Sequence, residues 1–162
     1  MLPPAKPLSA PPLYFDDLHV GQRFVSATHA LDAAQIIAFA QVFDPQSFHT
    51  DDAAARGTLF GGLAASGWHT AAISMRLLVS SGLPIAGGII GSGGELSWPR
   101  PTYPGDILRV ESEILELVPS RSRPERGMAV IRNEPRNQRD EIVQVFMPKL
   151  VVPRRPESDP RR

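Results

Sequence analysis

The strongest constraint on the fold is a change in the spacing of apolar residues near position 85. Before that point, two segments have the character of helices. After it, β-branched residues gather in short runs that are separated by Pro, Gly or charged turns. A run of helices followed by a run of strands predicts an α+β fold with an antiparallel sheet. Four strands are expected in the second part, at residues 85–98, 106–118, 128–133 and 141–152.

The first part of the chain is predicted to hold one strand and one helix with clear ends. Residues 22–30 have the character of a strand. Asp32 and Gln35 have the spacing of a capping box, so a helix should begin there. Pro45 disfavours the helical conformation at the residue before it, so this helix should end at Asp44.

A second, longer helix is predicted at residues 61–80, which are bounded by glycines and contain no proline. A loop that carries His49 and a short turn at residues 51–56 should connect the two helices. The longer helix is rich in small residues, so a curved sheet can pack closely against it. These small residues are Ala64, Ala65, Ser66, Gly67, Ala71, Ala72 and Ser74.

Two details of the strands predict how the sheet is arranged. Successive side chains of a strand point to opposite faces of the sheet. In the stretch 107–117 this alternation suggests one buried face and one face that is partly exposed to water. Pro135 lacks a backbone N–H group, so its stretch is expected at a sheet edge or at a bulge.

The chain is long enough for one domain with a real core but short for two. We expect the domain to span residues 13–152. Residues 1–12 and 153–162 are rich in Pro and charge and poor in apolar side chains, so we expect them to form loose tails.

Composition excludes several classes of function. The 17 basic residues balance the 17 acidic ones, which disfavours nucleic-acid and anionic-membrane partners. The chain has no cysteine, so thiolate chemistry is excluded, and its histidines lack a metal-binding spacing, so no metal site is expected. No segment has the length of a signal peptide or membrane span, and a cytoplasmic location is the simplest expectation.

The segment 43–49 (FDPQSFH) places Asp44 and His49 on either side of a rigid proline, where both can reach one cleft and hold one water. Burial and the negative end of the helix dipole should raise the pKa of Asp44, and His49 is suited to proton transfer near neutral pH. On spacing alone a plainer interpretation stays open, because Asp-Pro often begins a turn and a single loop histidine is usually exposed.

This segment resembles the signature of MaoC-like dehydratases and (R)-specific enoyl-CoA hydratases, which reads Asp, any residue, Asn, Pro, an aliphatic residue, His. Asp44 and His49 match the family's catalytic positions, and Gln46 stands at the Asn position. Ser47 and Phe48 depart from the pattern, since they replace the proline and the aliphatic residue.

Three further segments carry the same resemblance, and together they cover nearly the whole body of the chain. Residues 14–21 (YFDDLHVG) are similar to the family's opening phrase, and residues 65–67 (ASG) to the start of its central helix. Residues 100–106 (RPTYPGD) are similar to the family's turn that ends in Pro-Gly-Asp.

The resemblance implies a hot-dog fold, in which an antiparallel sheet wraps a long central helix, here residues 61–80. It implies homodimers whose interface forms an acyl-CoA channel, with coenzyme A as part of the substrate and no other cofactor. Asp44 and His49 would polarise a water that attacks the β-carbon of an enoyl thioester. The backbone N–H of Gly67 would stabilise the thioester oxygen, although this glycine has close packing as an equally good explanation. Ser66 replaces a histidine that many members carry, so any supporting role there would fall to its hydroxyl. Ser66 and Gln46 are expected, with Gly67, to be substrate-binding residues.

Several alternatives remain open at this stage. A thioesterase on the same fold could direct the activated water at the carbonyl, although the spacing of Asp44 and His49 favours the hydratase. A non-catalytic acyl-thioester-binding module, or the inert subunit of a two-chain hydratase, would explain the departures at Ser47 and Phe48. A basic cluster, Arg121, Arg123 and Arg126, could contact coenzyme A phosphates or be merely solvated. The carrier, coenzyme A or acyl carrier protein, is left undecided, as are acyl-chain length and branching.

Overall fold

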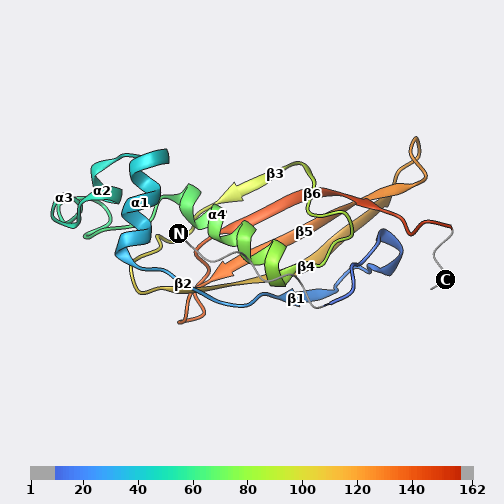
Figure 1. Cartoon of the computed structure of the whole chain (residues 1–162), viewed down its shortest axis with the longest axis horizontal. Coiled ribbons are helices and arrows are strands. Elements are labelled where there is room, and N and C mark those ends of the chain that lie inside the picture. Colours follow the sequence, from blue (N-terminus) through green and yellow to red (C-terminus); the bar gives the residue numbers. More distant parts are fainter. Residues whose placement is uncertain (1–9, 158–162) are drawn as a thin grey trace.

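The structure is a computed structural model that describes residues 10–157 of the 162-residue chain. A curved antiparallel sheet extends along the molecule, helix α4 lies along one of its faces, and α1, α2 and α3 gather at one end (Figure 1). This arrangement confirms the predicted α+β architecture. The helices are η1 (Phe15–Asp17), α1 (Ala33–Phe43), α2 (Ser47–Thr50), α3 (Asp52–Ala55), α4 (Gly67–Leu77) and a π turn, η2 (Leu78–Gly82).

The sheet has six strands in the order β1-β4-β5-β6-β3, with β2 paired to β4 beside this path, and the paired strands are antiparallel. The long β4–β5 and β5–β6 pairs form its centre. The strands are β1 (Arg23–Val25), β2 (His29–Ala30), β3 (Gly91–Ser97), β4 (Ile107–Pro119), β5 (Arg126–Arg136) and β6 (Val145–Pro153).

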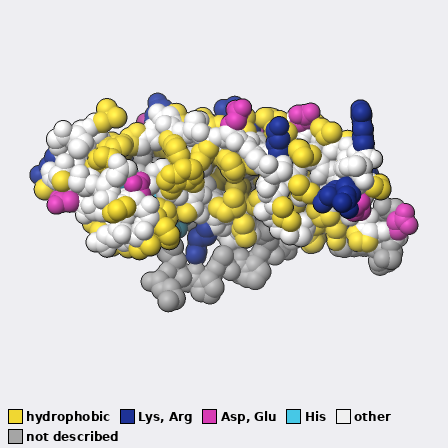
Figure 2. Space-filling view, turned by 90° about the horizontal axis from the view of Figure 1, so that it is seen from above, with side chains coloured by type: hydrophobic (Ala, Val, Ile, Leu, Met, Phe, Trp, Pro, Cys, Tyr) yellow, Lys and Arg dark blue, Asp and Glu magenta, His cyan; other side chains and the backbone are white. Residues whose placement is uncertain are grey.

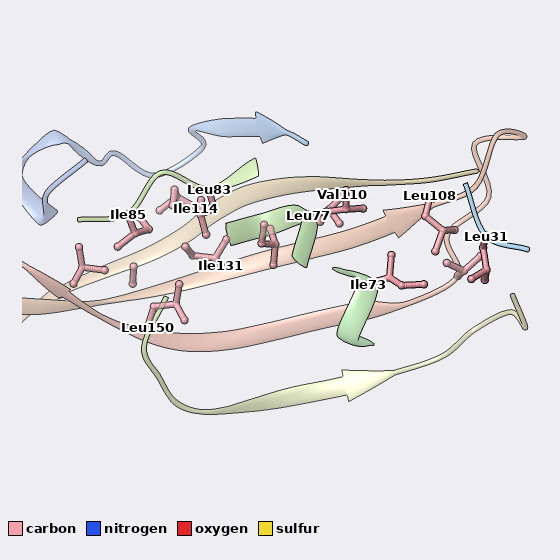
Figure 3. Close-up of a cluster of buried hydrophobic side chains, with 14 of the residues drawn as sticks. Leu31, Ile73, Leu77, Leu83, Ile85, Leu108, Val110, Ile114, Ile131 and Leu150 are labelled. Carbon is pink, nitrogen blue, oxygen red and sulfur yellow. The ribbon is translucent and has the colours of Figure 1, made fainter. Parts of the chain in front are cut away.

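The core lies between α4 and the face of the sheet that it covers (Figure 3). Ile73 and Leu77 of α4 meet strand residues such as Val110, Ile131 and Leu150, all of them nearly inaccessible to solvent. The alternation predicted in β4 is confirmed up to Ile114. There a β-bulge before Glu116 shifts the register between β4 and β5.

Helix α1 has the predicted limits. Its N-cap, Asp32, accepts a hydrogen bond from the backbone N–H of Gln35, and Asp44 is its C-cap. The Gln35 side-chain oxygen, however, bonds to His29 and does not accept the backbone N–H of Asp32, so only half of the expected capping box forms.

The predicted start of the long helix at Gly61 is wrong. Helix α4 begins at Gly67, because Ser66 caps it and the preceding backbone is bonded elsewhere. Ala64 donates its N–H to Phe48 O and Ala65 donates to Thr102 O, so these N–H groups bond to two other segments instead of to a preceding helical turn. At the other end, the π turn η2 carries the helical run on to Gly82.

The predicted first strand is two short ones, because Ser26 interrupts it. The Ser26 hydroxyl oxygen accepts the Val110 N–H in place of a backbone carbonyl. The strand predicted at residues 85–98 is shorter than expected. Gly87 and Gly88 have φ values of 75° and 91°, which produce a turn before β3 begins.

Pro135 lies within β5, a central strand, so the predicted edge position is wrong. Its carbonyl accepts a hydrogen bond from Val143, which precedes the first residue of β6. Because the N–H and C=O of one residue point to the same neighbour in an antiparallel sheet, the missing donor faces this irregular segment and leaves the pairing with β4 intact.

Residues 153–157, expected to begin a loose tail, are partly held by the domain. Pro153 is the last residue of β6, and Arg154 forms an ion pair of 2.8 Å with Asp16. Arg155 pairs with Asp17 of η1. The rest of this expected tail, and residues 1–9 of the other, lie outside the described residues. Within the described part of the chain, no helix is long and apolar enough to cross a membrane.

His69 of α4 joins α4 to α1. Its ring stacks on Phe39 with a centroid separation of 4.5 Å, and the residue is only 7% exposed. Burial lowers the pKa of His69 to about 4, with a smaller contribution from the charge of His29. His69 is therefore neutral in the folded protein at pH values where an exposed histidine is already protonated.

We expect His69 to reduce stability as the pH falls from about 6.5 to about 4. In this range the unfolded chain binds a proton that the folded chain rejects, so the free energy of unfolding falls by up to about 3 kcal/mol. His69→Phe keeps the stacked ring and should flatten this part of the pH profile of denaturant-induced unfolding. The exposed His19→Gln variant should keep the wild-type profile. Equal pH dependence in both variants would contradict the assignment.

Candidate functional site

Asp44 is placed by the end of helix α1. Its backbone N–H donates to Ala40 O at 2.9 Å, and its backbone leaves the helical conformation before Pro45. The side chain of Asp44 is 18% exposed. The proline signal in the sequence therefore located this carboxylate correctly.

His49 lies in the one-turn helix α2 rather than in the predicted loop, and it is buried instead of exposed. Its Nδ1 is 2.7 Å from Ala64 O. A carbonyl oxygen can only accept, so Nδ1 carries the proton. In the neutral ring, Nε2 is then an acceptor, and it faces Asp44 Oδ2 at 3.5 Å. This distance is longer than a direct hydrogen bond.

The environment of Asp44 favours its charged form. Burial raises the pKa of Asp44, but hydrogen bonds from Ser66 and Gln46 and the charge of His49 lower it, and the net direction is below the ordinary value. The expectation of a raised pKa is therefore wrong. The sequence reveals the helix end and the burial, but not the two donors that stabilise the carboxylate. Asp44 is thus ionised at neutral pH.

Gln46 contacts Asp44 directly. Its Nε2 donates to Asp44 Oδ1 at 2.8 Å, while its backbone carbonyl accepts from the His49 N–H at 2.9 Å. The extra methylene relative to asparagine does not prevent this contact. Gln46 therefore links Asp44 and His49 by one hydrogen bond to each. It does not line the cleft that opens beside them, which is described below.

Ser66 has two roles at the start of α4. Its oxygen accepts the N–H of Trp68 at 3.2 Å, which caps the helix, and its hydroxyl hydrogen-bonds to Asp44. The residue is 1% exposed. One hydroxyl thus links the beginning of α4 to the end of α1.

Gly67 is the first residue of α4, where a backbone N–H has no acceptor within the helix. A Cβ at this position would lie 2.6 Å from the indole of Trp98. Close packing therefore requires glycine here, whatever its N–H group does. Close packing on Trp98 and hydrogen-bond donation are compatible at Gly67. The packing involves its Cα, whereas the donor is its backbone N–H.

A cleft of about 610 Å³, named here the main cleft, opens beside Asp44 and His49. Its walls come from the segment after α3, the start of α4 and the turn after β3. The residues that line it are Asp44, His49, Leu59, Phe60, Ala65, Ser66, Gly67, Trp68, Thr70, Trp98, Pro99, Arg100, Pro101 and Thr102.

The aromatic and cationic walls of this cleft were not predicted from the sequence. Trp68 and Trp98 meet edge to face at 5.3 Å, and Arg100 adds a positive charge. Arg100 begins the RPTYPGD turn, so that motif was the available signal. By contrast, Arg121, Arg123 and Arg126 belong to the β4–β5 hairpin, at the opposite end of the sheet from α2 (Figure 1). Among the described residues, no cluster of three or more His, Asp or Glu side chains could hold a metal ion.

Comparison with known proteins agrees with this geometry. Residues 17–131 match the family model of the MaoC-like domain. The chain belongs to this family. The match includes Asp44, His49, Ser66 and Gly67, and so covers the whole candidate site.

Three relatives place the chain within the family. It is 61% identical to a MaoC-like dehydratase from Rhodospirillum rubrum, with a TM-score of 0.88 and coverage of 89% of this chain and 99% of the other. It is 29% identical to the (R)-hydratase PhaJ1 from Pseudomonas aeruginosa, with a TM-score of 0.70 and coverage of 88% and 86%. It is 30% identical over 149 residues to a 3-hydroxybutyryl-CoA dehydratase from Methylorubrum extorquens, covering 91% and 89%. The hot-dog fold is thereby confirmed.

Replacing Ser66 should separate its two roles. Both Ser66→Ala and Ser66→Gly remove a donor to the ionised carboxylate, so both should raise the pKa of Asp44. Alanine is a poor N-cap and should cost about 1 kcal/mol of stability, whereas glycine should cost only a few tenths. Carboxyl ¹³C NMR titration and denaturant-induced unfolding measure the two effects. An unchanged Asp44 pKa in both variants would rule out the link.

Proposed function

We propose that this MaoC-like protein is a hydratase and dehydratase of 2,3-enoyl thioesters, with Asp44 and His49 as its catalytic residues. The observation that supports this most directly is the pair of acceptors, His49 Nε2 and Asp44 Oδ2, that face each other at 3.5 Å on the wall of the main cleft. Neither can donate to the other while the imidazole is neutral, so a donor from outside must satisfy both.

A water molecule suits this position because it has two O–H groups. One donates to Nε2 and the other to Oδ2, which turns the oxygen lone pairs towards the cleft. The water is thus oriented as a nucleophile before substrate arrives. The Gln46 and Ser66 hydrogen bonds hold the carboxylate in place during this step.

Hydration follows from that orientation. The water oxygen bonds to the β-carbon while Nε2 accepts one of its protons, and the electron pair of the double bond moves towards the thioester oxygen. Nε2 of His49 then gives this proton to the α-carbon on the same face, which restores the neutral imidazole and completes the addition of one water. Dehydration is the reverse sequence.

The thioester oxygen gains negative charge during this addition and needs a fixed donor. We assign this role to the Gly67 N–H, which begins α4 and borders the main cleft. The positive end of the α4 dipole adds to the stabilisation. Arg100 supplies a positive charge that suits the phosphates of coenzyme A, which we propose as the carrier.

The relatives support this reaction class, since their names include a 3-hydroxybutyryl-CoA dehydratase and an (R)-hydratase. A thioesterase or a non-catalytic binding module would use the same cleft differently. Incubation with a short enoyl-CoA discriminates among them. Loss of the conjugated absorbance supports hydration, release of free thiol supports a thioesterase, and tight binding without either supports the module.

Asp44→Asn should lower the hydration rate at least about 100-fold. It removes the charge and replaces an acceptor with a donor on one side of the proposed water. The loss of enoyl absorbance measures the rate, and thermal unfolding serves as the control for folding. The matched Asp16→Asn change lies in η1, which packs near the start of β5 and away from the main cleft, and it should keep nearly full activity. Wild-type turnover in Asp44→Asn would refute the role of the carboxylate.

We further propose that the protein forms a homodimer through α4 and the free edge of β3. Trp68, Met75 and Val79 leave 61%, 38% and 52% of their surface exposed on one side of α4 and η2. Strand β3 ends the sheet, so its outer backbone groups are open to pairing. Hydrophobic side chains extend across the middle of the face on the β3 side of the molecule, with Lys and Arg near its margins (Figure 2).

Sedimentation velocity should show a dimer for the wild-type chain. Val79→Asp places a charge within the proposed interface and should shift the protein to monomer. The matched change Val42→Asp, on the exposed side of α1, should leave the dimer intact. A wild-type monomer at micromolar concentration would contradict this proposal without affecting the assignment of Asp44 and His49.

A further inference from the structure

A second cavity of about 190 Å³ lies between α4 and the β3 side of the sheet. It shares Trp68 with the main cleft, so the two spaces adjoin. Its residues are uncharged and mostly apolar: Trp68, Ala71, Ser74, Met75, Leu78, Leu96, Asn133, Gln144 and Phe146.

Trp98 links the walls of the two spaces through a hydrogen bond. It lines the main cleft and packs edge to face on Trp68. Its indole Nε1 donates a hydrogen bond of 2.9 Å to Gln144 Oε1 on the wall of the second cavity. An indole nitrogen can only donate, so this contact fixes which end of the Gln144 amide is oxygen.

The orientation leaves the Gln144 NH₂ group as a donor without an acceptor. Gln144 is 1% exposed, and within the described part of the chain its Nε2 has no hydrogen-bond partner. Asn133 in the same wall differs, because its amide accepts from Ser112 and donates to Phe146 O. Because Gln144 lines the second cavity, its NH₂ group can donate to a ligand that enters this space.

We propose that the second cavity binds the far end of the substrate's acyl chain, and that this end carries an uncharged oxygen which accepts a hydrogen bond from Gln144 Nε2. The inference rests on the proposed function, since it assumes an acyl thioester in the main cleft. The apolar wall suits the methylene groups of the chain. A terminal carboxylate is disfavoured, because no lining residue could compensate its charge. The substrate class is thus an enoyl thioester with a distal hydroxyl or keto group.

Ligand binding can be measured without turnover, because Trp68 and Trp98 are the chain's two tryptophans and both border these spaces. Saturated coenzyme A thioesters cannot be hydrated and serve as probes. Each ω-hydroxyacyl thioester is compared with the alkyl thioester in which a methyl group replaces the hydroxyl: 4-hydroxybutanoyl with pentanoyl, 5-hydroxypentanoyl with hexanoyl, and 6-hydroxyhexanoyl with heptanoyl. Tryptophan fluorescence gives the Kd of each.

At one chain length, the hydroxyl thioester should bind about tenfold more tightly than its methyl counterpart. Gln144→Met removes the donor and should abolish this preference. Gln41→Met makes the same change on an exposed side chain of α1 that lines neither space, and it should retain the preference. Equal or weaker binding of the hydroxyl thioester at every length in the wild-type protein overturns the inference, whether or not Gln144→Met folds. A preference that persists in folded Gln144→Met also overturns it.

The corresponding enoyl thioesters separate this inference from the reaction itself. Hydration without a hydroxyl preference overturns only the role of Gln144. A Gln144-dependent preference in binding, with no hydration and no thiol release, supports the cavity and overturns the proposed chemistry. Failure of all six saturated probes to bind overturns the inference, and the proposed reaction is overturned as well only if the enoyl thioesters are also not hydrated.

Discussion

The hydrogen bond from His49 Nδ1 to Ala64 O is the contact on which the candidate site depends. It assigns the proton to one ring nitrogen and turns the other towards Asp44. Ala64 can offer its carbonyl because the segment before α4 is not helical and is held by Phe48 on one side. If that segment were helical, as the sequence suggested, the carbonyl would be available for a helical bond instead. The irregular backbone at residues 61–66 is therefore a condition for the imidazole geometry.

Much of the site could be predicted because its signals are local. Pro45 ends α1 at Asp44, and the spacing to His49 follows from the same short segment. The α+β architecture also followed from local periodicity. What the sequence could not show depends on long-range contacts. The start of α4 is decided by bonds to Phe48 and Thr102, and the low pKa of Asp44 depends on Ser66.

The errors in the sheet have a related cause. Local rules treat Pro135 as a residue that disrupts pairing, yet the tertiary arrangement directs its missing donor to an irregular neighbour. Ser26 shows the opposite effect, because a side-chain oxygen takes over a backbone role and divides a strand that looks continuous in sequence. In both cases the identity of the neighbouring strand decides the outcome, and a single strand's sequence does not contain it.

The contact between Gly67 and Trp98 has a consequence for how such a protein can vary. Any side chain at position 67 must displace the indole, and the indole in turn holds the Gln144 amide. A change at position 67, on the wall of the main cleft, would therefore be transmitted to the wall of the second cavity. The two walls cannot change independently along this line of contacts, so sequence divergence at position 67 requires compensating substitutions at Trp98 or Gln144.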